Sequence, residues 1–294
     1  MLQKVLDEPK QKVSYDPNEK LTVDVDLSLC SDEEMPRMIH IVNRLAKSEA
    51  GRETLEIANK AGVKFGFLDA KTNCFGCYFG GDMKYIGLGP MASDDKLVST
   101  LCHESRHAGQ AERMKDIPDR DQLNVASIIR YSRAKEADAQ AYAVKACKEL
   151  EMQGDKGPLA TFAKFYPPIY KAYEASIAKE GVLNDTVVAD VFKGWYDQTG
   201  TKQNYEEGYI IEPMHDAIKG NFTRMYTFAE NVDSKTVVEK VGWTKNGNYL
   251  SAENPDFLDE PRFASVGERT KSDAQAFFEI RQRCAGIDPD KSVD

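Results

Sequence analysis

Apolar side chains recur every three or four residues over much of the chain, which is the spacing of one face of a helix. Ser31 and Glu34 form a capping box before the first of these segments. A second segment, 52–61, ends at Gly62, a residue suited to the C-terminus of a helix. The same spacing predicts further helices over residues 159–180, 185–198 and 268–283.

Shorter segments have the patterns of strands, either alternating or wholly apolar. Residues 63–68 predict one strand, and residues 78–79 and 84–88 predict a pair joined by a Gly-Gly-Asp turn. The alternation over residues 21–27 predicts an edge strand. We therefore expect a small antiparallel sheet just before a long helix over residues 95–113.

The predicted order of elements indicates an α+β fold. Residues 1–30 form an N-terminal extended segment and residues 31–150 form the core, with the sheet and two long helices. Residues 151–294 are mainly helical and belong either to the same domain or to a second one.

One short motif in the helix predicted over residues 95–113 carries the chemistry. It reads His103-Glu104-Ser105-Arg106-His107. Two histidines four residues apart lie on the same face of a helix, so both imidazoles can reach one metal ion. Glu104, beside the first histidine, is placed to take a proton from a metal-bound water. The chain has only 4 histidines, so the presence of two in this motif argues against a chance match.

A third ligand has to come from another segment, because a catalytic zinc site has three protein ligands and one open position. The alanine-rich residues 132–147 predict a helix that can approach the first one closely. Glu136 on this helix is the candidate ligand. Asp138 competes with it, but lies about 200° around the helix from Glu136. We therefore expect Asp138, together with Gln110, to hold a ligand histidine from behind.

The motif followed by Glu136 resembles the glutamate-type zincins, in which a second helix supplies a glutamate as the third zinc ligand. Residues 136–143, Glu-Ala-Asp-Ala-Gln-Ala-Tyr-Ala, are similar to the Glu-x-x-Ala pattern of several such families. The histidine-ligand branch is not matched, because Gln110 and Arg113 stand where it has Gly and His. Residues 60–145 also resemble a bacterial domain family described only as metallopeptidases of unknown substrate. The resemblance implies a zincin-like core that binds zinc.

Composition and charge argue against some binding partners and some cellular locations. The net charge of -9 and pI of about 5.2 argue against nucleic acid or an anionic membrane surface as a partner. No apolar run is long enough to span a bilayer, and the N-terminus lacks the pattern of a secretory signal, so we expect a cytoplasmic protein. The 6 cysteines are too few for a disulfide scaffold. Cys74 and Cys77 are either ordinary cysteines or half of a zinc or redox site.

Together these features predict a zinc-dependent hydrolase, a metallopeptidase with one zinc ion per chain and a peptide or protein substrate. His103, His107 and Glu136 hold the metal, and Glu104 acts as the general base. A second donor is normally needed to stabilise the oxyanion. The candidates, chosen by residue type and position, are Tyr205, Tyr209 and His215.

Two alternatives remain open in the sequence. Residues 84–88 are either an exposed strand that pairs with an extended peptide or a fully paired interior strand. The chain is either an enzyme or a non-catalytic zincin-like binding module with a structural metal or none. A closed site with Asp138 or His215 as a fourth ligand would indicate the binding module.

Overall fold

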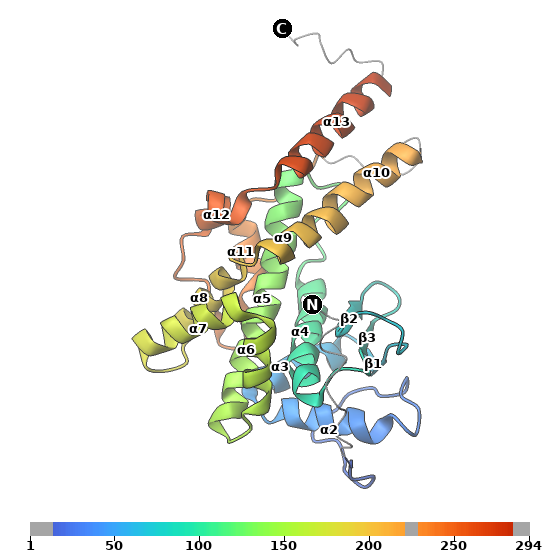
Figure 1. Cartoon of the computed structure of the whole chain (residues 1–294), viewed down its shortest axis with the longest axis vertical. Coiled ribbons are helices and arrows are strands. Elements are labelled where there is room, and N and C mark those ends of the chain that lie inside the picture. The colour runs from blue at the N-terminus through green and yellow to red at the C-terminus, as the bar shows by residue number, and fades with distance from the viewer. Residues whose placement is uncertain (1–13, 221–228, 285–294) are drawn as a thin grey trace.

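The computed structural model describes residues 14–220 and 229–284, and helices make up 61% of it (Figure 1). A three-stranded sheet and a helical C-terminal part complete the fold, which confirms the predicted α+β class. The N-terminal half contains α2 (Met35–Ala46), α3 (Glu49–Lys60), β1 (Lys64–Phe67), β2 (Gly76–Phe79), β3 (Tyr85–Leu88), α4 (Asp94–Arg113) and α5 (Val125–Met152). The C-terminal half contains α6 (Gly157–Phe165), α7 (Pro167–Glu180), α8 (Asp185–Trp195), α9 (Thr199–Glu206), the π-helix η1 (Glu207–Ile211), α10 (Glu212–Lys219), α11 (Ser234–Val241), β4 (Trp243–Thr244), β5 (Gly247–Asn248), the 3-10 helix η2 (Pro255–Asp259), α12 (Pro261–Ala264) and α13 (Glu268–Cys284).

The sheet has the order β1-β3-β2 and is mixed. β3 pairs antiparallel with β2 but parallel with β1, so the expectation of an antiparallel sheet is wrong for one of the two strand pairs. The reason is topological: the chain forms β2 before it returns as β3 between the other two strands. Residues 84–88 therefore hold an interior strand, and β2 is an edge of the sheet.

The predicted edge strand over residues 21–27 is also wrong. This segment joins the sheet only through one parallel bridge, between Asp26 and Lys64. The alternation of apolar and polar residues has another cause. Val23, Val25 and Leu27 point into the core, whereas the residues between them are exposed or half-buried.

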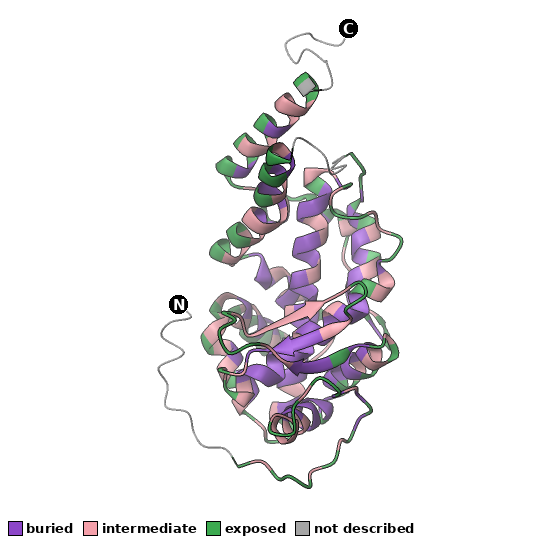
Figure 2. Cartoon of the chain, turned by 90° about the vertical axis from the view of Figure 1, so that its right-hand side faces the viewer, coloured by how far each residue is buried: buried purple, intermediate pink, exposed green. Residues whose placement is uncertain are grey.

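The two helices that carry the motif residues begin at side-chain caps. Ser93 accepts a hydrogen bond from the Lys96 amide at the start of α4, and Asn124 accepts one from the Ser127 amide at the start of α5. α5 lies at the centre of the molecule, between α4 on one side and α6 to α8 on the other (Figure 1). Small buried residues such as Ala137 let α4 and α5 approach closely. Figure 2 shows α5 buried over much of its length.

Beyond α5 the chain is mainly helical, as predicted, and the domain boundary expected near residue 150 remains a prediction. α10 and α13 lie side by side and project beyond the rest of the fold (Figure 1). None of the helices in residues 14–220 and 229–284 combines the length and the apolar character needed to cross a bilayer.

A buried ion pair connects α5 to the C-terminal elements. Arg133 on α5 donates from Nη2 to Glu206 Oε1 at 2.6 Å, and its Nη1 donates to the carbonyls of Phe263 and Ser265. Glu206 Oε2 accepts from Thr270 Oγ1 at 2.6 Å and from the Gly267 amide at 2.9 Å. Because every oxygen of this carboxylate has a donor, the pair fixes α9 and the start of α13 on α5.

Replacing Glu206 should therefore destabilise the fold strongly. Glu206→Gln leaves Arg133 buried without a carboxylate, and we expect the free energy of unfolding to fall by about 3–5 kcal/mol. The measurement is urea unfolding at equilibrium. The matched control is Glu207→Gln, which removes a solvent-exposed pair with Arg269 and should cost less than about 1 kcal/mol. Equal losses in the two variants would contradict the structural role given to Glu206.

Candidate metal centre and active site

The two motif histidines project from the middle of α4 toward α5. Their Nε2 atoms lie 3.0 Å apart, and the two rings stand at 89° to each other. Both side chains are about one-eighth exposed, at 12%. The i, i+4 spacing therefore brings two nitrogen donors to one point, as the sequence predicts for a helix.

Glu136 on α5 completes the group. Its carboxylate oxygens lie 3.3 Å from His103 Nε2 and 3.4 Å from His107 Nε2. Zinc ligands at 2.0–2.1 Å from a tetrahedral ion stand about 3.3 Å from one another. The three separations of 3.0, 3.3 and 3.4 Å thus fit one metal ion held by two nitrogens and one oxygen. Within the described part of the chain, His103, His107 and Glu136 form a group whose ligand atoms all lie within 4.8 Å.

The charges of the three residues are coupled. Burial alone would raise the pKa of Glu136, but the two imidazoles lower it well below its ordinary value. Burial disfavours protonation of His107, yet the carboxylate of Glu136 outweighs this and raises the pKa of His107. The group therefore concentrates negative charge at the point where the nitrogen donors converge, which favours a cation there.

Glu104 lies beside this group but outside it. Its side chain is buried, and its charge acts on His107, Tyr205 and Tyr209. β2 passes directly over it at Gly76, where an added Cβ would come within 3.2 Å of Glu104 Cγ and 2.5 Å of Thr100 Cγ2. A glycine is needed here because the edge strand approaches the helix too closely for a side chain.

Gln110 and Asp138 support His107 through a chain of hydrogen bonds. His107 Nδ1 lies 2.7 Å from Gln110 Oε1, and Gln110 Nε2 donates to Asp138 Oδ2 at 2.7 Å and to the Lys135 carbonyl at 2.9 Å. The two donations fix the amide so that its oxygen faces the ring, and His107 Nδ1 is then the donor. Asp138 makes no hydrogen bond or ion pair with a histidine in the described residues, so it acts on His107 only through Gln110, which corrects the expectation that it holds the histidine directly. By contrast, His103 Nδ1 is buried with no hydrogen-bond partner in the described residues.

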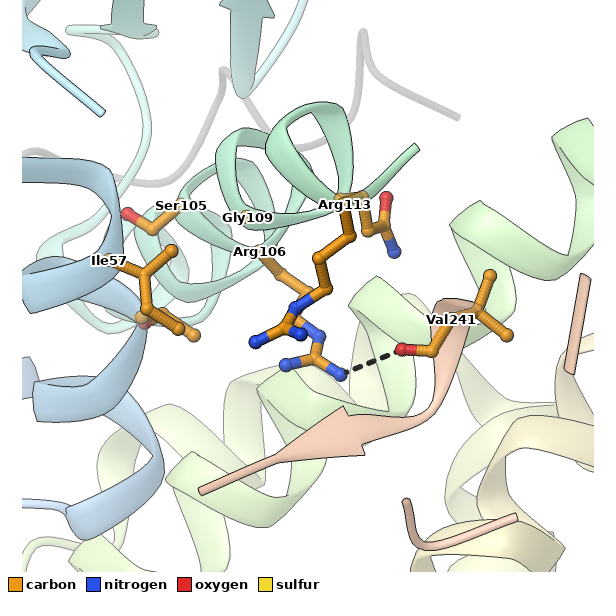
Figure 3. A pocket seen from close by; sticks show the side chains of 8 residues that line it. Ile57, Ser105, Arg106, Gly109, Arg113 and Val241 are labelled. Atoms are coloured by element: carbon orange, nitrogen blue, oxygen red, sulfur yellow. Dashed lines mark hydrogen bonds between the residues drawn. The ribbon is translucent and has the colours of Figure 1, made fainter. Parts of the chain in front are cut away.

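Asp138 is held in turn by Arg106 and Tyr249. Arg106 donates two hydrogen bonds to its carboxylate, at 2.8 and 2.9 Å, and Tyr249 donates a third at 2.8 Å. Arg106 also donates to the carbonyl of Val241 (Figure 3). Burial would lower the pKa of Arg106, but Asp138 raises it, so the guanidinium stays charged. The pocket in Figure 3 lies on this side of α4, next to α3, and has about the room of one water molecule.

The structure separates the three candidates for the oxyanion donor. Tyr205 and Tyr209 lie near Glu136 and Glu104, and burial together with these carboxylates raises the pKa of both phenols. Both phenols therefore remain protonated donors. His215 lies away from the site, with 45% of its side chain exposed and an ion-pair contact of 3.8 Å to Asp273.

Cys74 and Cys77 also lie near the site. Burial and the charge of Glu104 raise the pKa of both thiols, that of Cys77 to about 11. A thiol must lose its proton to bind zinc, so these environments favour ordinary half-buried cysteines over metal ligands. Cys30, Cys102 and Cys147 are free as well.

Two cations near the site were not singled out by the sequence. Arg120, in the connection between α4 and α5, lies with Cζ 4.9 Å from the centre of the Tyr209 ring. Lys135 precedes Glu136, the candidate metal ligand, and lies with Nζ 5.0 Å from the centre of the Tyr131 ring. Burial lowers the pKa of Lys135, Glu136 raises it in part, and Arg120 lowers it further. Lys135 could have been identified from the sequence, because it is next to Glu136. Arg120 lies in a loop, and nothing in the sequence around it indicates that it lies near the site.

Breaking the support of His107 should weaken metal binding without emptying the site. Gln110→Met keeps the length of the side chain but removes the acceptor of His107 Nδ1, and we expect a loss of roughly 10–100-fold in zinc affinity. Tyr249→Phe, which removes only the hydroxyl that donates to Asp138, should cause a smaller loss. The measurement is competition with a chromogenic zinc chelator, with melting of the metal-free protein recorded beside it. Gln275→Met, an exposed change on α13, is the control, and wild-type affinity in Gln110→Met would contradict the role of the amide.

Comparison with known proteins gives one result. Residues 20–226, more than half of the chain, match the model of the "Putative metallopeptidase family (DUF6782)". No curated protein and no solved structure matches the chain. The matched range includes the histidine helix, Glu136 and both tyrosines of the site. The chain therefore belongs to this family.

Proposed function

We propose that the protein is a zinc-dependent peptidase of the glutamate-ligand zincin type. His103, His107 and Glu136 are the zinc ligands, and Glu104 is the general base. The observation that carries the proposal is the convergence of two imidazole nitrogens and one carboxylate at separations that fit zinc, with a further carboxylate beside them. Two nitrogens and one oxygen are a donor set typical of catalytic zinc.

The other residues of the site have defined tasks in peptide hydrolysis. A zinc ion held by His103, His107 and Glu136 would supply Lewis-acid chemistry, which lowers the pKa of a water molecule toward neutrality. The carboxylate of Glu104 would accept a proton from the attacking water and deliver it to the leaving amine. Gly76 lets the edge strand cover Glu104 on one side, which limits the access of bulk water to the base.

The partners of Asp138 and His215 support an open site over a closed, structural one. Asp138 is engaged by Arg106, Tyr249 and Gln110, and it lies behind His107. His215 is paired with Asp273 away from the site. Neither is available as a fourth ligand, so one coordination position remains for water or substrate.

Tyr205 and Tyr209 are the candidates for stabilising the oxyanion. Tyr209 lies in the π-helix η1 and Tyr205 in α9 just before it, and insertions of this kind are frequent at functional sites. Tyr205 interacts most directly with the Glu136 carboxylate, and its phenol is the first choice. Full turnover in a Tyr205→Phe variant would remove it from this role.

The substrate is expected to bind along β2. This strand pairs with β3 on one side only, and it borders α4 at Glu104. An extended peptide can add to such an edge through main-chain hydrogen bonds. β3, the segment proposed from the sequence, is paired on both sides and cannot take this part.

The first prediction concerns the metal. We expect about one zinc ion per chain in the purified protein, and loss of this zinc in a His103→Ala/His107→Ala double variant, because two of three ligands are removed. The measurement is elemental analysis by plasma mass spectrometry. His215→Ala is the matched control and should keep its zinc. Stoichiometric zinc in the double variant would place the metal elsewhere, with Cys74 and Cys77 the next residues to replace.

The second prediction separates an enzyme from a binding module. Glu104→Gln preserves the shape of the side chain and should leave zinc bound, but removal of the base should lower the rate of hydrolysis by roughly 100- to 10,000-fold. The measurement is cleavage of a library of internally quenched peptides by full-length protein, with chelator and zinc add-back.

Glu112→Gln on the same helix is the control, because Glu112 pairs with Lys84 and Lys115 away from the site. It should cleave like the wild type. Equal rates in wild type and Glu104→Gln would refute the mechanism, and a zinc-loaded wild type that cleaves nothing in the library would favour the non-catalytic module.

A further inference from the structure

Arg120 and Lys135, which we call the cationic pair, border the proposed active site. Arg120 lies over the ring of Tyr209, whose phenol is influenced by Glu136 and Glu104. Lys135 is half-buried on α5, and its charge acts on His107. Arg120 thus contacts a tyrosine of the candidate site, and Lys135 directly precedes Glu136 on α5.

Neither member of the cationic pair has a carboxylate at ion-pair distance in residues 14–220 and 229–284. Among the described residues, Lys96 and Arg113 also lie over aromatic rings without an ion pair, but Arg120 and Lys135 are the cations of this kind that border the candidate site. By contrast, Arg106 and Arg133, two buried arginines that support the fold, each form an ion pair with a carboxylate. Aromatic faces position Arg120 and Lys135, but a ring does not neutralise a full charge.

The backbone that carries Arg120 is held in place. The Gln122 amide donates to the carbonyl of Asp119 at 2.8 Å, and the Asn124 amide donates to the carbonyl of Glu230 at 2.8 Å. Ala229 and Glu230 in turn donate to the Gln122 carbonyl. The connection between α4 and α5 is therefore anchored on both sides of its turn, and Arg120 is presented from a fixed position.

Charge balance points to the missing partner. When a divalent ion occupies the site, the carboxylates of Glu104 and Glu136 offset its two charges. The cationic pair then adds a surplus of positive charge next to the reacting position, and the two cations repel each other. An anionic group of the substrate would offset the surplus positive charge and reduce the repulsion between the two cations. A carboxylate is the anion that peptides supply.

We propose that Arg120 and Lys135 bind a carboxylate of the substrate, so that the site selects peptides with an acidic side chain or a free C-terminus next to the scissile bond. This inference rests on the proposed peptidase function and specifies its substrate class.

The test measures binding rather than turnover. Four short peptides are titrated onto full-length, zinc-loaded Glu104→Gln protein by calorimetry, and onto the metal-free protein as a second readout. Acetyl-Ala-Ala-Glu-amide is compared with acetyl-Ala-Ala-Gln-amide, which tests an acidic side chain. Acetyl-Ala-Ala-Ala with a free carboxyl group is compared with its amide, which tests a free C-terminus. The two comparisons distinguish the two sources of the carboxylate.

We expect the carboxylate peptide of one comparison to bind about tenfold more tightly than its neutral match, the effect of one charge-assisted interaction. Arg120→Gln and Lys135→Gln should each abolish most of this ratio, with zinc content unchanged. Lys171→Gln removes one exposed positive charge on α7, far from α4 in Figure 1, and should preserve the ratio.

Ratios near one in both comparisons, including a lack of binding by all four peptides, would overturn the inference. The inference would also be overturned if the affinity ratio survived both Arg120→Gln and Lys135→Gln, or if it fell equally in Lys171→Gln. The proposed function fails separately: a clear carboxylate ratio in a wild type that cleaves no peptide would refute the peptidase and keep the binding site. Cleavage of peptides without any preference for a carboxylate would support the peptidase function and refute the carboxylate-binding site.

Discussion

The site depends on a buried ion pair between two helices. Arg106 and Asp138 join α4 to α5 with both side chains almost completely shielded from water, at 5% and 0% exposure. Removing two charges from water is costly, and such a pair is tolerated only where the remaining donors and acceptors are satisfied. Tyr249, Gln110 and the Val241 carbonyl supply those contacts. Because the pair is satisfied in a single arrangement, it sets the position of one helix along the other, and that position places Glu136 opposite the two histidines.

α4 thus performs two tasks on two faces. Its residues at 103 and 107 point toward the ligand group, whereas Arg106, next to them in sequence, points into the network that holds α5. Gln110 lies between the two faces and connects them, since it contacts both His107 and Asp138. A change in helix packing is therefore transmitted to the orientation of a ligand through one amide. Val241 and Tyr249, which complete the network, come from the part of the chain beyond residue 226, outside the range matched by the family model.

The sequence predicted what is encoded locally. The helix over residues 95–113 follows from its apolar spacing, and the meeting of His103 with His107 follows from helix geometry alone. The alanine-rich residues 132–147 predicted the second helix, but α5 extends beyond them at both ends, from Val125 to Met152. The angle around the helix indicated that Glu136 and Asp138 cannot both face the metal, and the structure groups Glu136 with the histidines while Asp138 pairs with Arg106. Features that depend on tertiary topology were not accessible. The parallel pairing of β1 with β3 requires knowledge of strand order, and the bond from Tyr249 to Asp138 joins residues 111 positions apart.

The ligand group is assembled largely by protein contacts. In small zinc domains the metal provides the folding free energy, since the ligands are dispersed without it. Here His107 is oriented by Gln110, Glu136 is positioned by the packing of α5 on α4, and the packing is fixed by a satisfied ion pair. Little reorganisation is then required when a metal binds, and most of the binding free energy is expressed as affinity instead of folding. A preorganised group of this kind suits the proposed catalysis, in which metal ligands have to keep their geometry while water and substrate exchange.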